Sequence, residues 1–128
     1  ENAELEILHA WELPGESLLS SGSGRISRTE LDLILETKEQ HHRQALAELL
    51  AGYGMDSQAD NVHLVKGRAA EVISSTVSER NIDLIVMGTL GRAGIPGLFI
   101  GNTAEEVLRK TKAAALTVKP SDFISPVE

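Results

Sequence analysis

The sequence predicts a single α/β domain of 128 residues, built on an open parallel sheet with helices on both faces. Three observations support this prediction. Short apolar runs alternate with longer segments whose apolar residues recur at helical spacing. Residues 84–87 (LIVM) are apolar without polar alternation, which is typical of a strand covered on both faces. A glycine-spaced loop follows this run and leads into a helix start, so the alternation of strands and helices continues, and right-handed crossovers are the default between parallel strands.

The first half of the chain contains one expected strand, one loop and one long helix. The strand is expected over residues 3–10 (AELEILHA). Residues 14–25 are rich in Pro, Gly and Ser and are expected to form a flexible loop. Ser27 and Glu30 have the spacing of a capping box, and the helix that they begin has apolar residues at helical intervals. Gly54 ends this helix, because glycine readily takes the left-handed conformation.

The second half continues the alternation of strands and helices. Asn102 is expected to cap the last helix, with Glu105 completing a capping box. The expected order of the whole chain is therefore β-α-β-α-β-α-β. The remaining elements are a strand at 62–65, a helix at 69–77, a strand at 84–87, a helix from 102 to about 111, a strand at 115–118 and a C-terminal tail at 120–128.

Composition excludes several classes of protein. A net charge of −7 and a pI near 5.1 argue against a nucleic-acid partner, which would require a basic face. The chain has one Trp, one Tyr and two Phe, too few aromatic rings for a base-stacking platform. Without cysteine, neither disulfides nor thiolate metal sites are available. No apolar run approaches the length of a bilayer span and no leader sequence is evident, so we expect a cytoplasmic domain without a membrane partner.

The histidines do not form an obvious catalytic or metal site. His41 and His42 lie on the long helix without an acidic or histidine partner four residues away, so we expect imidazoles at the surface or its boundary. His9 and His63 lie in strands and are expected to be packed or exposed rather than catalytic. No nucleophile stands beside a base and no metal-ligand cluster is recognisable. The sequence therefore favours a binding module over an enzyme.

The glycine loop is the candidate ligand site. Gly88, Gly91 and Gly101 have the spacing G-x2-G-x9-G, in which glycine lets backbone N–H groups approach a ligand closely. Phosphate groups would lie against these N–H groups and the positive end of the following helix dipole. As a bare spacing, the glycines fit equally well with tight turns and close helix packing. Arg92, inside the loop, is either a phosphate contact or a solvated side chain.

The string DLIVMGTLGRAGIPGLFIGNTAEEVLRKTKAAALTVKP resembles the C-terminal half of the universal stress protein family, whose hallmark is G-x2-G-x9-G followed by Ser or Thr. The stretch LEILHAW resembles the second strand of that family, and KGRAAEVI resembles its third strand and the turn into its third helix. The resemblance covers nearly the whole chain and implies a Rossmann-like fold of the adenine nucleotide alpha-hydrolase-like type. The segment GIPGLFIGNTAEEV is most similar to the tandem-domain E-type branch of the family, in which this chain would be the second of two domains.

The resemblance implies a stress-response module that binds ATP or a related nucleotide such as AMP, with or without Mg²⁺. It implies no catalytic residue, at most weak ATP hydrolysis, and no metal ligand from the protein. Ala10 matches the family position that flanks the adenine, and Gly67 would lie near the same cleft. Asn102 replaces the usual Ser or Thr of the family. By resemblance, the nucleotide-binding residues are Ala10, Met87, Gly88, Gly91, Arg92, Gly101, Asn102 and Thr103.

The resemblance also bears on assembly. In the family, the edge of the last strand commonly mediates dimers, which here assigns the dimer edge to Leu116, Thr117 and Val118. The expected partner is a second copy or a second domain of the same family. The alternative is an interaction domain that keeps the fold but uses the cleft for another ligand, or for none.

One departure from the family concerns the start of the chain. The family begins one strand earlier, with a strand that ends in an Asp contacting the base or ribose, and then a helix; both are missing here. Since that strand is central in the family, we expect a gap between the first two strands and the last two. An adjoining segment, a rearrangement or oligomerisation would then fill the gap, because unpaired buried backbone is costly.

Overall fold

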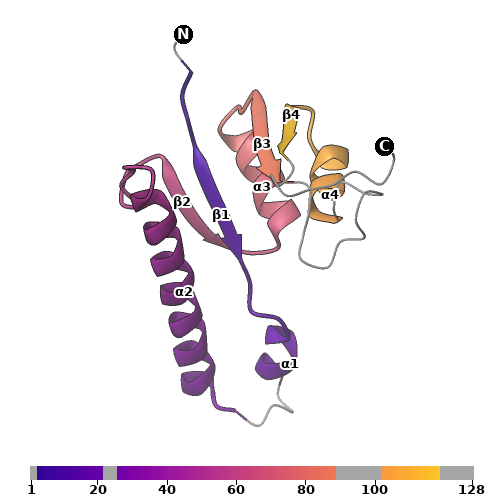
Figure 1. Cartoon of the computed structure of the whole chain (residues 1–128). Helices are drawn as coiled ribbons and strands as arrows, with labels where there is room; N and C mark the ends of the chain where they lie inside the picture. Colours follow the sequence, from indigo (N-terminus) through magenta and orange to yellow (C-terminus); the bar gives the residue numbers. More distant parts are fainter. Residues whose placement is uncertain (1–2, 22–25, 89–101, 119–128) are drawn as a thin grey trace, which may run out of the picture. The chain divides into compact units, whose positions relative to one another are not determined.

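The computed structural model describes residues 3–21, 26–88 and 102–118 (Figure 1). The described elements alternate as expected, with one additional short helix. They fall into two compact units, Glu1–Gly67 and Arg68–Glu128, which are described separately below. The elements are β1 (Ile7–Trp11), α1 (Glu16–Ser20), α2 (Arg28–Ala51), β2 (Val62–Lys66), α3 (Ala69–Glu79), β3 (Leu84–Gly88), α4 (Asn102–Lys110) and β4 (Ala114–Val118).

The first unit consists of a parallel strand pair and the long helix α2. β1 pairs with β2 in a register that runs from Ile7 opposite Val62 to Trp11 opposite Lys66. The N–H of Gly67 donates to the carbonyl of Trp11 at 2.8 Å, which continues the pairing one residue beyond β2. Trp11 is only 5% exposed, since its indole packs against α2. A parallel pair of this kind requires a crossover, and α2 provides it.

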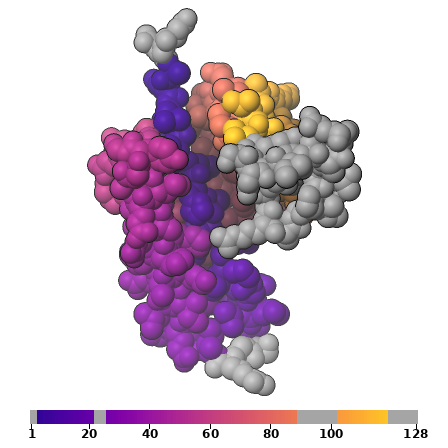
Figure 2. Space-filling model, viewed as in Figure 1, coloured from indigo at the N-terminus to yellow at the C-terminus, as the bar shows by residue number. Residues whose placement is uncertain are grey.

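Both ends of α2 follow the sequence prediction. At the start, the Ser27 hydroxyl accepts from the N–H of Glu30 at 3.1 Å, and the N–H of Ser27 donates back to Glu30 Oε1 at 3.5 Å. This reciprocal pair is the predicted capping box. After the helix, Gly54 has a φ of 69°, the left-handed conformation that its sequence position predicts. Figure 2 shows the outer surface of α2 in purple and magenta.

The segment 14–25 differs from its prediction. Its composition predicts a flexible loop, yet it contains the helix α1. Gly15 begins this helix with a φ of 79°, and Lys66 Nζ forms an ion pair with Glu16 Oε2 at 2.7 Å. The ion pair joins α1 to the end of β2, a contact between residues far apart in the sequence that local composition does not reveal. Residues 22–25 lie outside the described residues.

The second unit packs two helices on one face of a second strand pair. β3 and β4 are parallel, in a register that runs from Leu84 opposite Ala114 to Gly88 opposite Val118. Apolar side chains from α3, β3 and α4 form the core beneath the strands. The buried members are Ala70, Ile85 and Val107, with Ile73, Val77, Ile82, Met87, Ala113 and Ala115 packed against them. Val107 has no exposed surface.

The other face of this strand pair is exposed. Leu84 is 53% exposed and Val86 is 61% exposed on β3, and the neighbouring strand presents Leu116 and Val118 at 54% and 51%. The apolar run at 84–87 predicts a strand covered on both faces. Within the described part of the second unit, α3 and α4 both pack against the side of Ile85 and cover that face. An exposed apolar strand face therefore accompanies the glycine loop.

The strands form two sheets of two strands each in the part of the chain that is described, β1 with β2 and β3 with β4. These are the two pairs that the sequence analysis expects on either side of its gap. Among the described helices, none is both long and apolar enough to cross a bilayer. α2 has 24 residues but carries charged side chains along its length.

Candidate functional site

The candidate site lies between the end of β3 and the start of α4. Gly88 is the last residue of β3 and is exposed, and α4 begins at Asn102. Gly91, Arg92 and Gly101 fall in the segment 89–101, which is outside the described residues. The two described sides of the loop thus have the predicted arrangement, the carboxyl end of a parallel strand followed by the amino end of a helix.

The backbone surroundings do not explain why residue 88 is glycine. Gly88 does not have a positive φ. A Cβ built on it would meet the carbonyl oxygen of Val118 at 3.9 Å, an ordinary van der Waals contact, and no nearer atom among the described neighbours. Neither conformation nor packing in this part of the chain thus requires glycine. Close approach of a ligand to the backbone is one physical reason for a glycine at such a position.

The first turn of α4 presents two polar side chains. Asn102 and Thr103 are exposed, whereas Ala104 is 4% exposed and anchors the helix in the core. The sequence analysis places Asn102 one residue before the helix as its cap, whereas the structure makes Asn102 the first helical residue. Helix starts read from sequence are uncertain by a residue or two, which accounts for this difference. The amide of Asn102 and the hydroxyl of Thr103 are available to a ligand at this helix end.

The other predicted binding residues belong to strands. Met87 is half-buried and packs against the core of the second unit. Ala10 is half-buried in β1 of the first unit, opposite Val65 of β2. The predicted dimer edge, Leu116 to Val118, occupies the end of β4, and β4 pairs only with β3 among the described strands.

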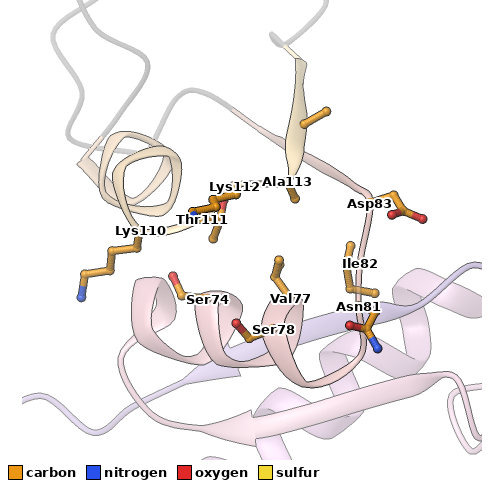
Figure 3. Close-up of a pocket in the computed structure, with 11 residues that line it drawn as sticks. Ser74, Val77, Ser78, Asn81, Ile82, Asp83, Lys110, Thr111, Lys112 and Ala113 are labelled. Atoms are coloured by element: carbon orange, nitrogen blue, oxygen red, sulfur yellow. The ribbon is translucent and has the colours of Figure 1, made fainter.

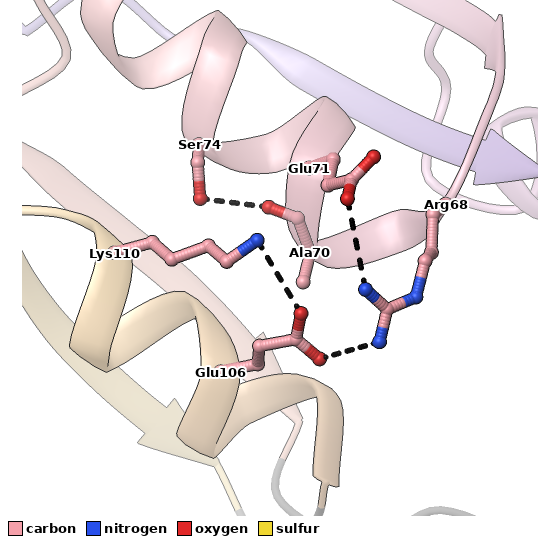
Figure 4. A network of polar contacts seen from close by, with 6 residues as sticks. All are labelled: Arg68, Ala70, Glu71, Ser74, Glu106 and Lys110. Atoms are coloured by element: carbon pink, nitrogen blue, oxygen red, sulfur yellow. Dashed lines mark hydrogen bonds and ion pairs between the residues drawn. The ribbon is translucent and has the colours of Figure 1, made fainter.

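A network of charged side chains attaches α4 to the start of α3 (Figure 4). Arg68 Nη2 donates to Glu106 Oε1 at 2.9 Å, and Lys110 Nζ lies 3.4 Å from Glu106 Oε2. Arg68 Nη1 also lies 3.6 Å from Glu71 Oε1. Glu106 is therefore neutralised by two cations, and its side chain is only 20% exposed. This network fixes the helix whose amino end faces the glycine loop.

Sequence reasoning misses this network because Arg68 and Glu106 are 38 positions apart. The local signals are two spacings, four residues between Glu106 and Lys110 and three residues between Arg68 and Glu71. Nothing in the sequence indicates that Arg68, in the turn after β2, would reach the same carboxylate.

A pocket lies at the opposite end of the second unit (Figure 3). Its volume is about 630 Å³, and it is bordered by the end of α3, the turn before β3 and the segment between α4 and β4. Val77, Ile82 and Ala113 provide apolar surface, and Lys112 and Asp83 are among its polar residues. The pocket adjoins the amino ends of β3 and β4, whereas parallel sheets bind ligands at the carboxyl ends of their strands. It is therefore distinct from the glycine loop.

The histidines of the first unit meet across the sequence. His9 Nε2 lies 3.2 Å from His42 Nδ1, and His41 is exposed on the helix beside them. The predicted place of His41 and His42, at the surface or its boundary, is confirmed. His63 Nε2 lies 2.6 Å from Glu6 Oε2. No group of three or more metal-binding side chains occurs in the described part of the chain.

Comparison with known proteins places this geometry in a family. Residues 1–119 match the model of the universal stress protein family. Universal stress protein E of Photorhabdus laumondii is 37% identical over 87 residues, which are 68% of this chain and 27% of that protein. Universal stress protein E of Escherichia coli K12 is 34% identical over the same length. The chain thus spans about a quarter of the length of these curated relatives.

Solved structures support the same assignment. A putative universal stress protein from Pseudomonas aeruginosa superimposes with a TM-score of 0.64 at 29% identity, covering 92% of this chain and 35% of that one. The hypothetical protein MJ0577 superimposes with a TM-score of 0.61 over 95% of this chain and 81% of its own, and at 20% identity this shows a common fold alone. The predicted Rossmann-like α/β fold is confirmed. With the glycine spacing, the strand and helix that flank it and these matches, the chain belongs to the universal stress protein family.

Proposed function

We propose that this chain is a cytoplasmic stress-response module that binds ATP or AMP at the glycine-spaced segment between Gly88 and Asn102. The observation that carries the proposal is Gly88, an exposed glycine at the carboxyl end of β3 whose described neighbours leave room for a side chain. Among the described residues neither conformation nor packing requires glycine at this position, and close approach of a phosphate to the backbone would require it.

The proposed site holds phosphate by backbone N–H groups and the amino end of α4. The glycines allow the backbone to approach, the amide of Asn102 and the hydroxyl of Thr103 donate to phosphate oxygens, and Arg92 supplies positive charge. Met87, at the end of β3, lines the nucleoside side. If Mg²⁺ accompanies ATP, the phosphates provide its ligands together with water.

The charge network supports this proposal in two ways. By attaching α4 to α3, Arg68 and Glu106 hold the amino end of α4 in place before a ligand arrives, which lowers the entropic cost of binding. Lys110 and Arg68 also offset the negative charge of Glu106, which would otherwise repel phosphate from this helix.

Calorimetry tests the proposal. Titration with ATP and AMP, with and without Mg²⁺, is expected to show saturable heat for the wild-type chain. Thr103→Val removes one hydroxyl from the site and is expected to weaken binding by about tenfold, the value of one hydrogen bond to a charged group. Thr29→Val, in the exposed first turn of α2, is the matched control and is expected to bind like the wild type. Absence of heat for the wild type, or equal affinity in all three, would overturn the proposal.

A second candidate function is supported by the exposed apolar face of β3 and β4. In this alternative the chain is an interaction domain that binds no nucleotide, and the face around Val86 and Leu116 contacts a protein partner. Ultraviolet absorbance of the denatured, purified chain distinguishes the two functions, because bound adenine absorbs near 260 nm. We propose no catalytic role beyond weak ATP hydrolysis, and a turnover assay with Thr103→Val tests that limit.

We also propose that the chain forms dimers through the edge of β4, at Leu116, Thr117 and Val118. β4 has one neighbour among the described strands, so its second edge offers unpaired backbone groups to another copy or to a second domain of the family. Light scattering over a range of concentrations tests this, and a strict monomer at high concentration would contradict it.

A further inference from the structure

Two imidazoles from different elements meet in the first unit. His9 lies in β1 and His42 in the second half of α2, with His9 Nε2 at 3.2 Å from His42 Nδ1. In this hydrogen bond one ring donates and the other accepts. An imidazolium has two N–H donors and no acceptor. The bond therefore tolerates one added proton and is lost when both rings are protonated.

The indole of Trp11 fixes the ring of His42 in this position. The two rings are stacked, with centroids 5.7 Å apart and planes inclined by 25°. Trp11 follows His9 by two positions on the same face of β1, so His42 contacts both residues of that face. The attachment of α2 to β1 thus includes one ring whose charge changes near neutral pH.

The charged groups around His9 and His42 disfavour protonation of the pair in the attached state. On α2, Lys38 and His41 each carry positive charge when protonated, and this charge lowers the pKa of His42. On β2, His63 is engaged by Glu6, and Lys66 is paired with Glu16. The charges that shift the pKa of His42 therefore include no carboxylate that would stabilise its protonated form.

We propose that the contact of His9 and Trp11 with His42 is a pH-sensitive attachment, which holds α2 on β1 when the imidazoles are neutral and releases it when both are protonated. Protonation places two like charges at hydrogen-bonding distance and removes the only acceptor between them. The middle of α2 then separates from the strand, while the capping box at Ser27 keeps the start of the helix intact.

The pKa of His42 is shifted in the direction that this proposal requires. Burial lowers the pKa of His42 below its ordinary value of 6.5, and His9, His41 and Lys38 lower it further. In the released state the ring is solvated and its pKa returns toward 6.5. Protons then bind the released state in preference, so acidification through this range favours release.

Trp11 is the only tryptophan of the chain and reports on the contact directly. We expect its fluorescence to change on acidification below pH 6.5, together with the ring nitrogen shifts of His9 and His42 in NMR spectra of the unmodified chain. Over the same range, hydrogen-exchange protection of the amides around His42 is expected to fall on the order of five- to tenfold, the value of one net hydrogen bond. Protection at the start of α2 is expected to change less.

Three variants separate this mechanism from general acid unfolding. His42→Gln and His9→Gln remove one titrating ring each and are expected to abolish the fluorescence transition. His41→Gln is the matched control, because His41 neighbours His42 but is exposed and makes no hydrogen bond to the strand within the described structure. It is expected to keep the transition. A transition that survives in His42→Gln, or rings that titrate in the unmodified chain without loss of protection in α2, would overturn the proposal.

Discussion

Arg68 and Glu106 are joined by a hydrogen bond of 2.9 Å between the turn that precedes α3 and the middle of α4. The bond couples two helices that also contribute Ala70, Ile73 and Val107 to the apolar core of the second unit. We expect Glu106→Ala to lower stability by about 1 kcal/mol, since Arg68 is more than half exposed and solvent screens its charge. Thermal unfolding measures this, with Glu71→Ala as the control. Glu71 is 60% exposed and lies 3.6 Å from Arg68, so its loss is expected to change stability little. Equal effects of the two variants would show that the contact with Glu106 has no special role.

Gly88→Ala separates folding from ligand binding. Its added Cβ would meet Val118 at ordinary contact distance, so the unfolding temperature is expected to stay the same or rise slightly. Nucleotide affinity is expected to fall by about tenfold or more, because the methyl group occupies the place of a phosphate that contacts the backbone. Circular dichroism and calorimetry measure the two effects. Unchanged affinity would remove Gly88 from the site.

Ser27→Ala tests the cap of α2. The substitution removes the hydroxyl that accepts from Glu30, and we expect it to cost about 1 kcal/mol in urea unfolding. Ser27→Asp is expected to retain most of the stability, since aspartate also caps helices and favours the positive end of the dipole. If the aspartate variant is as unstable as the alanine variant, the hydroxyl contributes something other than the cap.

Leu116→Lys tests the exposed face of β3 and β4. Leu116 is 54% exposed, so we expect a stability change within about 0.5 kcal/mol. The charge is expected to weaken any self-association through this face and the β4 edge, which sedimentation measures. Val107→Ala is the contrasting variant, because Val107 is fully buried and its truncation is expected to cost about 2 kcal/mol. A large loss of stability in Leu116→Lys would mean that the face is covered in solution.

The lowered pKa of His42 predicts how the stability of the chain depends on pH. Its pKa is lowered in the folded chain, mainly by burial, so the unfolded chain binds the proton first. The contribution of His42 to the free energy of unfolding is therefore expected to be complete above about pH 6.5 and to be lost as the pH drops from 6.5 toward the lowered folded value. His42→Gln is expected to flatten this part of the curve. His41→Gln removes only one of the lesser causes of the shift and is expected to keep most of the slope. A curve that keeps its slope in His42→Gln would assign the dependence to other groups.

The sequence predicts the elements of this fold well because each has a local cause. The capping box of Ser27 and Glu30, and the left-handed Gly54, are properties of a few neighbouring residues. The helix α1 is missed because the ion pair between Glu16 and Lys66 joins residues 50 positions apart. Local composition carries no information about such a contact.

In the candidate site, too, features with a local cause are predicted and contacts between distant residues are not. Gly88 and the amino end of α4 occupy the expected positions, since a strand, glycine spacing and a helix start are all local patterns. The contacts of Arg68 with Glu106 and of His9 with His42 join residues that are far apart in the sequence, and no spacing in the sequence predicts them. The apolar run at 84–87 also reveals that a strand is present but not how many of its faces are covered.

The two strand pairs also bear on how the chain reaches its folded state. β1 with β2 joins Ile7 to Val62, and β3 with β4 joins Leu84 to Ala114, so both closures are long and neither is a hairpin. The entropy of closing a loop grows only with the logarithm of its length, which makes the first pairing more costly than the second by only about 0.5 kcal/mol. Chain length alone therefore gives neither unit a clear lead in folding. The order of folding then depends on the helix that connects the two strands of each pair, α2 in the first unit and α4 in the second. Strengthening α2 or α4 would determine which half of the chain organises first.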